Sequence, residues 1–313
     1  MIIAIIIAVL IAILLAIYVF ITKNLFNFAI VRHDTKKEIT KEWLDRHGFS
    51  GYEDEIIEAR NEFLAADFEK VEIKSYDGLT LRGLLCNTPN AKGTIILFHG
   101  YRSTPDIDFC VAKKFYARLG LNVLLPYQRA HGESEGSYIT FGVRERYDVH
   151  SWVEFINKMV GYQLPIFLFG LSMGSSTVLM STEKPFSDNV KLIIADCGFT
   201  SPYSIFKHVV KSTMKIPFSL FIPLFNFMCK KKAGFSVYEY STIKALKNCK
   251  IPIFFIHGDS DNFVPPYMTD ENYGACISEK YILKVKNAPH AASFMYDSGE
   301  YKKTLETLIS KYL

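Results

Sequence analysis

The 313-residue chain contains no Cys-x-x-Cys pair and no cluster of cysteine and histidine at the spacing of a metal site. Its six cysteines are scattered singly, which argues against a structural zinc site and against a disulfide framework. A strong charge of one sign is also missing, because 36 Lys and Arg stand against 32 Asp and Glu, giving a net charge of +4. Binding to nucleic-acid phosphates needs clustered basic residues, so no nucleic-acid partner is expected.

The composition is that of a folded protein. Apolar residues make up 49% of the chain and charged residues 22%, a balance that disordered chains do not have. A chain of this length can bury a sizeable core in one large domain or two small ones.

Charged residues are absent from the first 21 positions, which are almost wholly Ile, Ala, Leu, Val and Phe. About 20 apolar residues are enough for a helix to cross the hydrocarbon core of a membrane. A cleaved signal peptide is the alternative, but the apolar run is long for one, no basic residue precedes it and no Ala-x-Ala site follows. We therefore expect residues 1–22 to form an uncleaved, single-pass transmembrane anchor.

Basic residues follow this anchor, whereas only the α-amino group precedes it. They are Lys23, Arg32, Lys36, Lys37 and Lys41. Because basic residues are retained on the cytoplasmic side, the remainder of the chain is expected in the cytoplasm. Cysteines without an evident partner agree with a reducing compartment.

Residues 23–66 are charged and helix-like, and we expect a membrane-proximal helical connector there. The pattern then changes: residues 68–74 and 79–86 alternate apolar and polar around a Tyr-Asp-Gly turn, which predicts an antiparallel hairpin. Six continuous apolar runs follow, as in strands buried on both faces of a parallel sheet. These runs cover residues 94–98, 122–125, 166–169, 190–195, 251–256 and 281–285.

Segments with helical periodicity alternate with these strands. They cover residues 107–119, 143–160, 172–182 and 300–313. A hairpin followed by alternating strands and helices predicts an α/β domain, a mostly parallel sheet wrapped by helices, over residues 67–313. The alternation is interrupted once, at about residues 200–246.

The sequence Gly-Leu-Ser-Met-Gly at residues 170–174 comes directly after a predicted strand and directly before a predicted helix. This is the G-x-S-x-G spacing in the strand–turn–helix context that gives the motif its meaning. The glycines keep side chains away from a tight turn, and the helix N-terminus favours developing negative charge. An ordinary glycine-rich turn could have the same sequence pattern, but here a candidate base and candidate carboxylates occur elsewhere in the chain. Ser172 is therefore the candidate nucleophile.

A serine hydroxyl needs a base to remove its proton and a carboxylate to orient that base. His257 and His290 are the two histidines beyond the interrupted segment. His290 lies in the loop between the last strand and the last helix, as suits a general base, whereas His257 follows a strand and is expected to hydrogen-bond locally. His290 is therefore the candidate base.

Three aspartates follow predicted parallel strands and are candidates for the carboxylate. Asp261 and Asp259 follow the strand that ends at residue 256, and Asp196 follows the strand before it. The carboxyl ends of parallel strands meet at one edge, where active sites collect. Asp261 is preferred, Asp259 is expected to cap a turn, and Asp196 remains a contender.

A tetrahedral oxyanion needs two N–H donors. The residue after the nucleophile, Met173, supplies one of them. The loop after the strand at residues 94–98 begins His-Gly-Tyr, and the amide of Tyr101 is the expected second donor, with Gly100 allowing close approach of the backbone.

Taken together, these motifs resemble the serine hydrolases of the α/β-hydrolase superfamily. The resemblance rests on His-Gly at 99–100, Gly-Leu-Ser-Met-Gly at 170–174, His-Gly-Asp-Ser-Asp at 257–261 and Pro-His at 289–290. Residues 128–134, Gln-Arg-Ala-His-Gly-Glu-Ser, are close to a turn common in that superfamily, with alanine in place of the usual glycine; we assign this turn no chemistry.

The resemblance covers about residues 68–313 and is strongest to membrane-tethered bacterial esterases, lysophospholipase-like and prolyl-peptidase-like hydrolases. It implies the α/β-hydrolase fold, with a mostly parallel eight-stranded sheet, flanking helices and a small helical lid. It also implies a catalytic Ser172, Asp261 and His290, an oxyanion hole at Tyr101 and Met173, and neither a metal nor an organic cofactor.

The interrupted segment, at residues 200–246, corresponds to the position of that lid. No acidic residue occurs between Cys197 and Glu239, yet the segment contains six lysines: Lys207, Lys211, Lys215, Lys230, Lys231 and Lys232. Residues 216–229 are strongly apolar but too short and too proline-broken to span a bilayer. We expect a lid with an apolar face over the acyl pocket. A second hypothesis is that the lid rests on anionic lipid headgroups, each lysine contributing roughly 1 kcal/mol.

The function expected from the resemblance is hydrolysis of a carboxylic ester, from a small molecule or a lipid, through an acyl-enzyme intermediate. A peptidase or an acyltransferase using the same three residues is the alternative, since only the pocket and the acceptor differ. A non-catalytic membrane scaffold that retains the fold is a third reading, against which the complete set of candidate residues argues.

Overall fold

The computed structural model describes residues 1–33, 38–215 and 217–313. Of the positions used above, Lys36 and Lys37, which entered the orientation argument, and Ile216, the first residue of the apolar stretch, lie outside the described residues.

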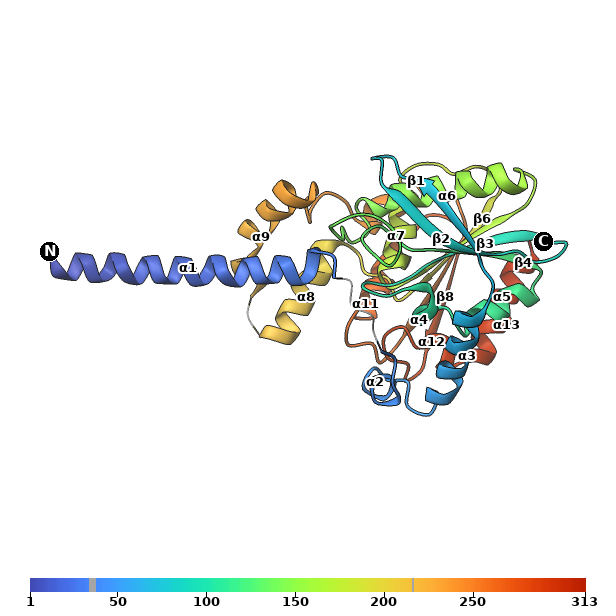
Figure 1. Ribbon diagram of the computed structural model, residues 1–313, viewed down its shortest axis with the longest axis horizontal. Helices are drawn as coiled ribbons and strands as arrows, with labels where there is room; N and C mark the ends of the chain where they lie inside the picture. The colour runs from blue at the N-terminus through green and yellow to red at the C-terminus, as the bar shows by residue number, and fades with distance from the viewer. Residues whose placement is uncertain (34–37, 216) are drawn as a thin grey trace.

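The centre of the molecule is an eight-stranded sheet with the order β1-β2-β4-β3-β5-β6-β7-β8 (Figure 1). The strands are β1 (Glu69–Lys74), β2 (Thr80–Cys86), β3 (Gly93–Phe98), β4 (Leu121–Pro126), β5 (Ile166–Leu171), β6 (Val190–Asp196), β7 (Ile253–Gly258) and β8 (Lys280–Val285). β2 runs antiparallel to its neighbours β1 and β4, and the other described pairs are parallel. The predicted hairpin and the predicted mostly parallel sheet are both confirmed.

The continuous apolar runs correspond to strands in the middle of the sheet. β3, β4, β5 and β7 are buried along their whole length, whereas the edge strands β1 and β8 expose part of theirs. A strand covered on both faces has no polar side to alternate with, which is why these runs are uninterrupted.

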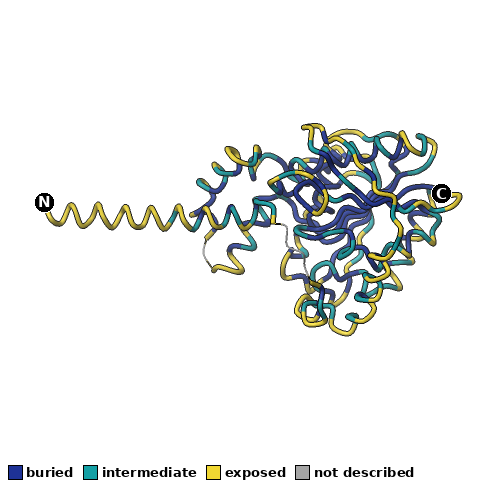
Figure 2. Tube along the Cα trace, in the orientation of Figure 1, coloured by how far each residue is buried: buried dark blue, intermediate teal, exposed yellow. Residues whose placement is uncertain are grey.

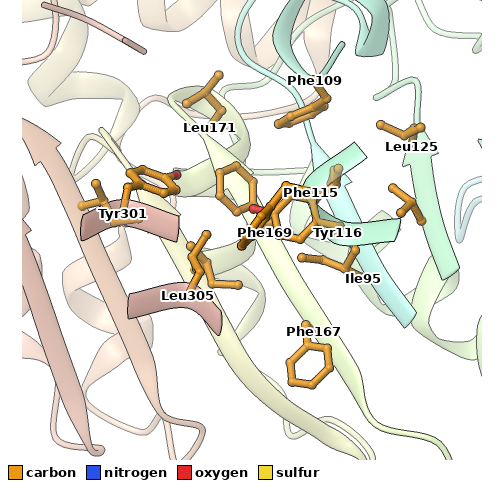
Figure 3. Close-up of a cluster of buried hydrophobic side chains, with 14 of the residues drawn as sticks. Ile95, Phe109, Phe115, Tyr116, Leu125, Phe167, Phe169, Leu171, Tyr301 and Leu305 are labelled. Atoms are coloured by element: carbon orange, nitrogen blue, oxygen red, sulfur yellow. The ribbon is translucent and has the colours of Figure 1, made fainter. Parts of the chain in front are cut away.

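Helices cover both faces of the sheet. One face packs against α2 (Lys41–Arg46), α3 (Glu53–Ala65), α5 (Ala112–Arg118) and α13 (Ser298–Ser310), with the side chains that Figure 3 shows between sheet and helices. The other face packs against α6 (Glu145–Val160), α7 (Met173–Ser181), α10 (Thr242–Leu246) and α11 (Tyr267–Ala275). The short helices α4 (Pro105–Asp108) and α12 (Ser293–Tyr296) lie in loops beside the sheet.

The single helix predicted over residues 107–119 is wrong in one respect, because the structure divides it into α4 and α5. The interruption falls at residues 109–111, where the side chains of Phe109 and Cys110 turn into the core. The chain leaves the regular helix at these residues, and the two side chains are buried.

The N-terminal helix α1 (Ile2–Ile30) projects from the domain, as Figures 1 and 2 show, and its first two-thirds are exposed. It continues to Ile30 rather than ending near residue 22, and Phe26 and Ile30 are buried. These last turns pack against α8 (Pro202–Met214) and α9 (Ile222–Met228), which flank α1 in Figure 1. Two short helices complete this segment, η1 (Phe218–Leu220) and the π-helical turn η2 (Cys229–Ala233).

Candidate active site

Ser172 lies on a tight turn between β5 and α7. Its backbone angles are φ 55° and ψ −113°, a region that residues other than glycine rarely adopt and that stores strain. A Cβ on Gly170 would lie 2.3 Å from the carbonyl oxygen of Gly174, and a Cβ on Gly174 would lie 2.0 Å from the carbonyl oxygen of Phe98. Both motif glycines are therefore required by contact with backbone.

Ser172, His290 and Asp261 form a hydrogen-bonded chain. The Oγ of Ser172 lies 2.9 Å from Nε2 of His290, and Nδ1 of His290 lies 2.6 Å from Oδ2 of Asp261. The carboxylate can only accept, so Nδ1 carries the proton and Nε2 is left to accept a hydrogen bond from the serine. This is the tautomer that a general base needs.

Asp261 is buried at 3% exposure and fixed by further bonds. Its Oδ1 accepts hydrogen bonds of 2.9 Å from the amides of Phe263 and Val264, and its Oδ2 lies 3.1 Å from Nε2 of His257. Burial by itself would raise the pKa of this carboxyl, but the bonds from His257 and His290 outweigh burial and hold its pKa below the usual value. The carboxylate therefore stays ionised at neutral pH.

His257 is fully buried and bonds locally. Its Nδ1 lies 2.6 Å from the hydroxyl of Thr269, and its Nε2 lies 2.8 Å from the carbonyl oxygen of Val264 as well as near Asp261. Asp259 accepts a 2.7 Å bond from the amide of Asn287. Neither residue is positioned to take a proton from Ser172.

Asp196 lies at the end of β6 with its own set of partners. Its carboxylate accepts bonds from the hydroxyls of Tyr301 at 3.0 Å and Ser293 at 3.3 Å. Burial raises its pKa, and the carboxylate bonded to His290 is that of Asp261.

The amides of Tyr101 and Met173 are the candidate oxyanion donors. Met173 is the first residue of α7, where a helix leaves its N–H groups without an internal partner. In the described part of the chain, neither amide donates a hydrogen bond to another protein group. Both remain available to a ligand.

The loop that carries Tyr101 is held on both sides. Asp108 accepts from the amide of Gly100 at 2.7 Å and from the hydroxyl of Ser103 at 2.5 Å. The amide of Arg102 donates to Nε2 of His131 at 3.0 Å. A Cβ on Gly100 would make only ordinary contacts, so the expected need for a glycine there does not come from crowding.

A cavity of about 680 Å³ opens beside Ser172 and His290. Its volume falls within the roughly 300–1,000 Å³ range of small-molecule sites. The walls are mainly apolar and aromatic, and Figure 3 shows several of them: Phe109, Tyr116, Phe169, Leu171 and Tyr301.

One wall of this cavity comes from the membrane-proximal connector. Trp43 and Leu44 of α2 and Phe49 after it line the cavity, and Gly48 contacts Pro289, the residue before His290. Among the described residues, none from 200–246 lines it. The structure thus gives the cavity a cover that sequence reasoning missed, for which the only signal was a few large apolar residues in a charged segment.

Cys197, Asp261 and His290 offer ligand atoms within 4.8 Å of one another. Burial raises the pKa of the Cys197 thiol well above its usual value, whereas a metal ligand must be the thiolate. Nδ1 of His290 and the Asp261 carboxylate are already bonded to each other. His290 and Asp261 therefore fit the hydrogen-bonded chain with Ser172 better than a metal centre.

Comparison with known proteins extends these observations. No family model matches the chain. The uncharacterised protein YqkD of Bacillus subtilis is 26% identical over 247 residues, covering 77% of this chain and 81% of YqkD. A thermostable monoacylglycerol lipase of a Bacillus species is 25% identical over 223 residues, covering 65% of this chain and 84% of the lipase.

Among solved structures, the esterase Pf2001 of Pyrococcus furiosus superimposes with a TM-score of 0.66 at 22% identity. The match covers 80% of this chain and 93% of the esterase. At this level of identity the likeness shows a shared fold.

Proposed function

We propose that this chain is a member of the α/β-hydrolase superfamily and a serine hydrolase that cleaves carboxylic esters. The observation that carries the proposal is the hydrogen-bonded chain from Ser172 through His290 to Asp261, with distances of 2.9 and 2.6 Å. Serine, imidazole and buried carboxylate in this order are the parts that activate a hydroxyl nucleophile.

In the first half-reaction, Ser172 Oγ attacks the ester carbonyl carbon while His290 Nε2 takes the hydroxyl proton. The carbonyl oxygen becomes an oxyanion that accepts hydrogen bonds from the amides of Tyr101 and Met173. His290 then gives its proton to the leaving alcohol as the C–O bond breaks, and the acyl group remains on Ser172.

In the second half-reaction, water attacks the acyl carbon and His290 takes the water proton. Collapse of this second oxyanion breaks the bond to Oγ, and His290 returns the proton to Ser172 as the carboxylic acid leaves. Asp261 stays ionised throughout and stabilises the imidazolium formed in each half-reaction.

The apolar cavity supports an acyl group as the part of the substrate that is bound. Trp43, Phe109 and Phe169 line it, and aromatic walls of this kind favour a hydrocarbon chain or a ring over a charged group. The matched relative from Bacillus is a monoacylglycerol lipase and the matched structure is an esterase, which agrees with an ester substrate.

A peptidase or an acyltransferase is the alternative, since neither requires a change in the three residues. In a peptidase an amine leaves in place of the alcohol, and in an acyltransferase an alcohol or an amine replaces water as the acceptor. Substrate comparison separates these reactions. A non-catalytic scaffold would have no need for the strained backbone at Ser172 or for the two available amides.

The proposed location is a membrane, with α1 as an uncleaved anchor. The described residues contain one helix long and apolar enough to span a bilayer, α1, a test that a signal sequence would also pass. Burial of Phe26 and Ile30 in the domain supports retention of the helix. The basic residues after the span, including Lys23 and Lys41, support a cytoplasmic catalytic domain.

The segment containing α8 and α9 is proposed to touch the same membrane. About 20 residues at 1.5 Å each cover the hydrocarbon core, so the core boundary falls near residue 21 of α1. The ring of Phe221 stacks on that of Tyr18 at 5.9 Å, and Lys232 lies 5.7 Å from the ring of Phe26. These contacts support a position of the segment at headgroup depth, and its six lysines are all exposed. Anionic lipid headgroups are the partner that fits them.

Fluorescence quenching in the full chain tests this contact. Leu220→Trp, at an exposed position next to Phe221, is expected to be quenched by lipids brominated near the headgroup, more strongly in anionic than in neutral bilayers. Tyr162→Trp, in the loop after α6, is the control and should not be quenched. Equal quenching at the two positions would remove the proposal for this segment.

The catalytic proposal is tested by labelling with a fluorophosphonate probe. The wild type should be labelled, whereas Ser172→Ala and His290→Gln should not. His257→Gln, which removes a histidine that bonds Asp261, Val264 and Thr269 but not Ser172, should still be labelled. Labelling of Ser172→Ala would overturn the nucleophile assignment, and p-nitrophenyl esters beside matched anilides would separate esterase from peptidase activity.

A further inference from the structure

The C-terminal end of the membrane helix is bonded to the loop that carries Tyr101. The phenol of Tyr101 donates to the carbonyl oxygens of Phe28 at 3.1 Å and Ala29 at 3.0 Å. The guanidinium of Arg102 also donates to the Phe28 carbonyl and lies 4.9 Å from the Phe28 ring. Burial raises the pKa of Tyr101 to about 12, so the phenol keeps its proton and remains a donor.

The hydrogen bonds from this loop provide partners for carbonyl groups at the C-terminal end of α1. A helix leaves its last four carbonyls without an internal partner. In α1, the carbonyl of Asn27 lies 3.0 Å from Nε2 of His33 and that of Ile30 accepts from the amide of Ile139 at 2.8 Å. The two carbonyls between them are the ones bonded to Tyr101 and Arg102. A cation at a helix C-terminus also complements the helix dipole.

The turn at residues 128–134, to which we assigned no chemistry from the sequence, takes part in the same hydrogen-bond network. Arg32, two residues beyond α1, donates from its guanidinium to the carbonyls of Gly132 at 2.7 Å and Ser134 at 2.5 Å. His131, from the same turn, accepts the amide hydrogen of Arg102. The end of the membrane helix, this turn and the loop with Tyr101 therefore form one hydrogen-bonded unit.

We infer that the end of α1 positions the oxyanion loop, so that the membrane anchor is a working part of the catalytic site. The inference rests on the proposed function, in which the Tyr101 amide binds the oxyanion. The amide and the phenol belong to one residue, and the phenol is fixed to the helix. Tyr101 through its side chain, Arg102 and Arg32 are positioning residues.

The test is Tyr101→Phe in the full chain, which removes the phenol but keeps the amide and the ring. An oxyanion donor acts mainly in the transition state, so a displaced amide lowers kcat rather than raising KM. We expect kcat for an ester to fall about 10-fold, less than the roughly 10²–10³-fold cost of losing a donor, with KM within about twofold. Tyr162→Phe, which loses only surface bonds to Glu154, is the matched control and should keep the wild-type kcat.

Fluorophosphonate labelling distinguishes a failure of this inference from a failure of the proposed function. Slower labelling of Tyr101→Phe that still reaches one probe per chain supports the inference, because the nucleophile and the fold are then intact. The inference is overturned if Tyr101→Phe keeps the wild-type kcat. It is also overturned if a change of similar size appears in KM while kcat is unchanged. If Ser172→Ala is labelled, the proposed function fails instead. Arg32→Met, outside the oxyanion loop, should reproduce the fall in kcat, and a wild-type rate for it would overturn the role of the helix end.

Discussion

At the scale of single residues, Asp261 determines the chemistry of the candidate site. Its two oxygens accept bonds from two imidazoles and two backbone amides. Burial of a carboxylate costs free energy and raises its pKa, whereas each charge-assisted bond favours the ionised form. Here the bonds prevail, and the pKa of Asp261 lies below its ordinary value.

This lowered pKa predicts how stability depends on pH. The unfolded carboxyl titrates near pH 3.9, so at about that pH and below the unfolded state binds more protons than the folded state. The contribution of Asp261 is complete above about pH 5 and declines as the pH falls toward the folded pKa. Urea denaturation should show a steeper loss of unfolding free energy between about pH 5 and 3 in the wild type than in Asp261→Asn. Parallel curves for the two proteins would contradict this.

Sequence reasoning named the candidate serine and histidine and preferred Asp261 as the carboxylate, but it left Asp196 as a contender. Ser172 is marked by flanking glycines and His290 by its loop, and both signals are local. Three aspartates end up at one edge of the sheet, and only their partners differ: Asp261 bonds His290, Asp259 bonds an amide, and Asp196 bonds Tyr301. Those partners come from chain segments far away, so local patterns do not identify them.

At the scale of elements, the turn between β5 and α7 depends on close approach of backbone to backbone. The start of α7 lies against the end of β3, and Gly174 is where they touch. Cβ atoms essentially never come within 3.0 Å of another heavy atom, so any larger residue there forces the helix away from the sheet. The strain at Ser172 is tolerated because both flanking elements are buried.

Gly174→Ala should therefore fold poorly. Its Cβ would lie 2.0 Å from the Phe98 oxygen and 2.7 Å from the His99 oxygen. We expect a loss of about 4 kcal/mol or more in unfolding free energy, at the extreme of single substitutions. Gly274→Ala in α11 is the control, since a Cβ there has no neighbour within 4 Å. It should be neutral or stabilising by up to about 1 kcal/mol, and denaturant midpoints measure both.

The cavity is a second feature at this scale, and only the folded chain reveals its cover. Trp43, Leu44 and Phe49 occur in the segment that the sequence predicted to be a membrane-proximal helical connector. The same residues line the cavity beside Ser172, while the segment expected as a lid packs against α1. The cover of the cavity and the packing of the expected lid both depend on which elements contact each other in the fold. Composition carries no information about such contacts.

Narrowing the cavity should change which acyl chains are accepted. Val111 lines it at the start of α5 and is only partly buried, so Val111→Trp can be accommodated while filling space. We expect kcat/KM for a decanoyl ester to fall at least about 10-fold, with little change for an acetyl ester, since one methylene is worth roughly 1–3 kcal/mol in a fitted pocket. Val111→Ala is the matched control and should keep long-chain activity. An equal loss for both esters would mean that the cavity does not hold the acyl chain.

For the whole molecule, the main feature is that one helix is both the candidate membrane span and part of the folded domain. α1 is about 43 Å long at 1.5 Å per residue, more than the roughly 30 Å of a hydrocarbon core. The excess length is the part that packs against α8, α9 and the loop that carries Tyr101. As the proposed anchor, a rigid helix that continues into the domain would fix the orientation of the domain, which a flexible tether would not.

Two phenylalanines on α1 should therefore respond differently to truncation. Phe26 is 1% exposed and packs on Phe225 and Tyr138, whereas Phe20 is 68% exposed on the part of α1 that projects from the domain. Phe26→Ala leaves a cavity in the domain and is expected to cost about 3–5 kcal/mol of unfolding free energy in detergent. Phe20→Ala should change it by less than about 0.5 kcal/mol. Because the packing of Phe26 also holds the end of α1 in place, its loss should slow ester hydrolysis at temperatures where the domain is still folded. Equal, small effects of the two substitutions would mean that α1 is only a tether and that the domain is complete without it.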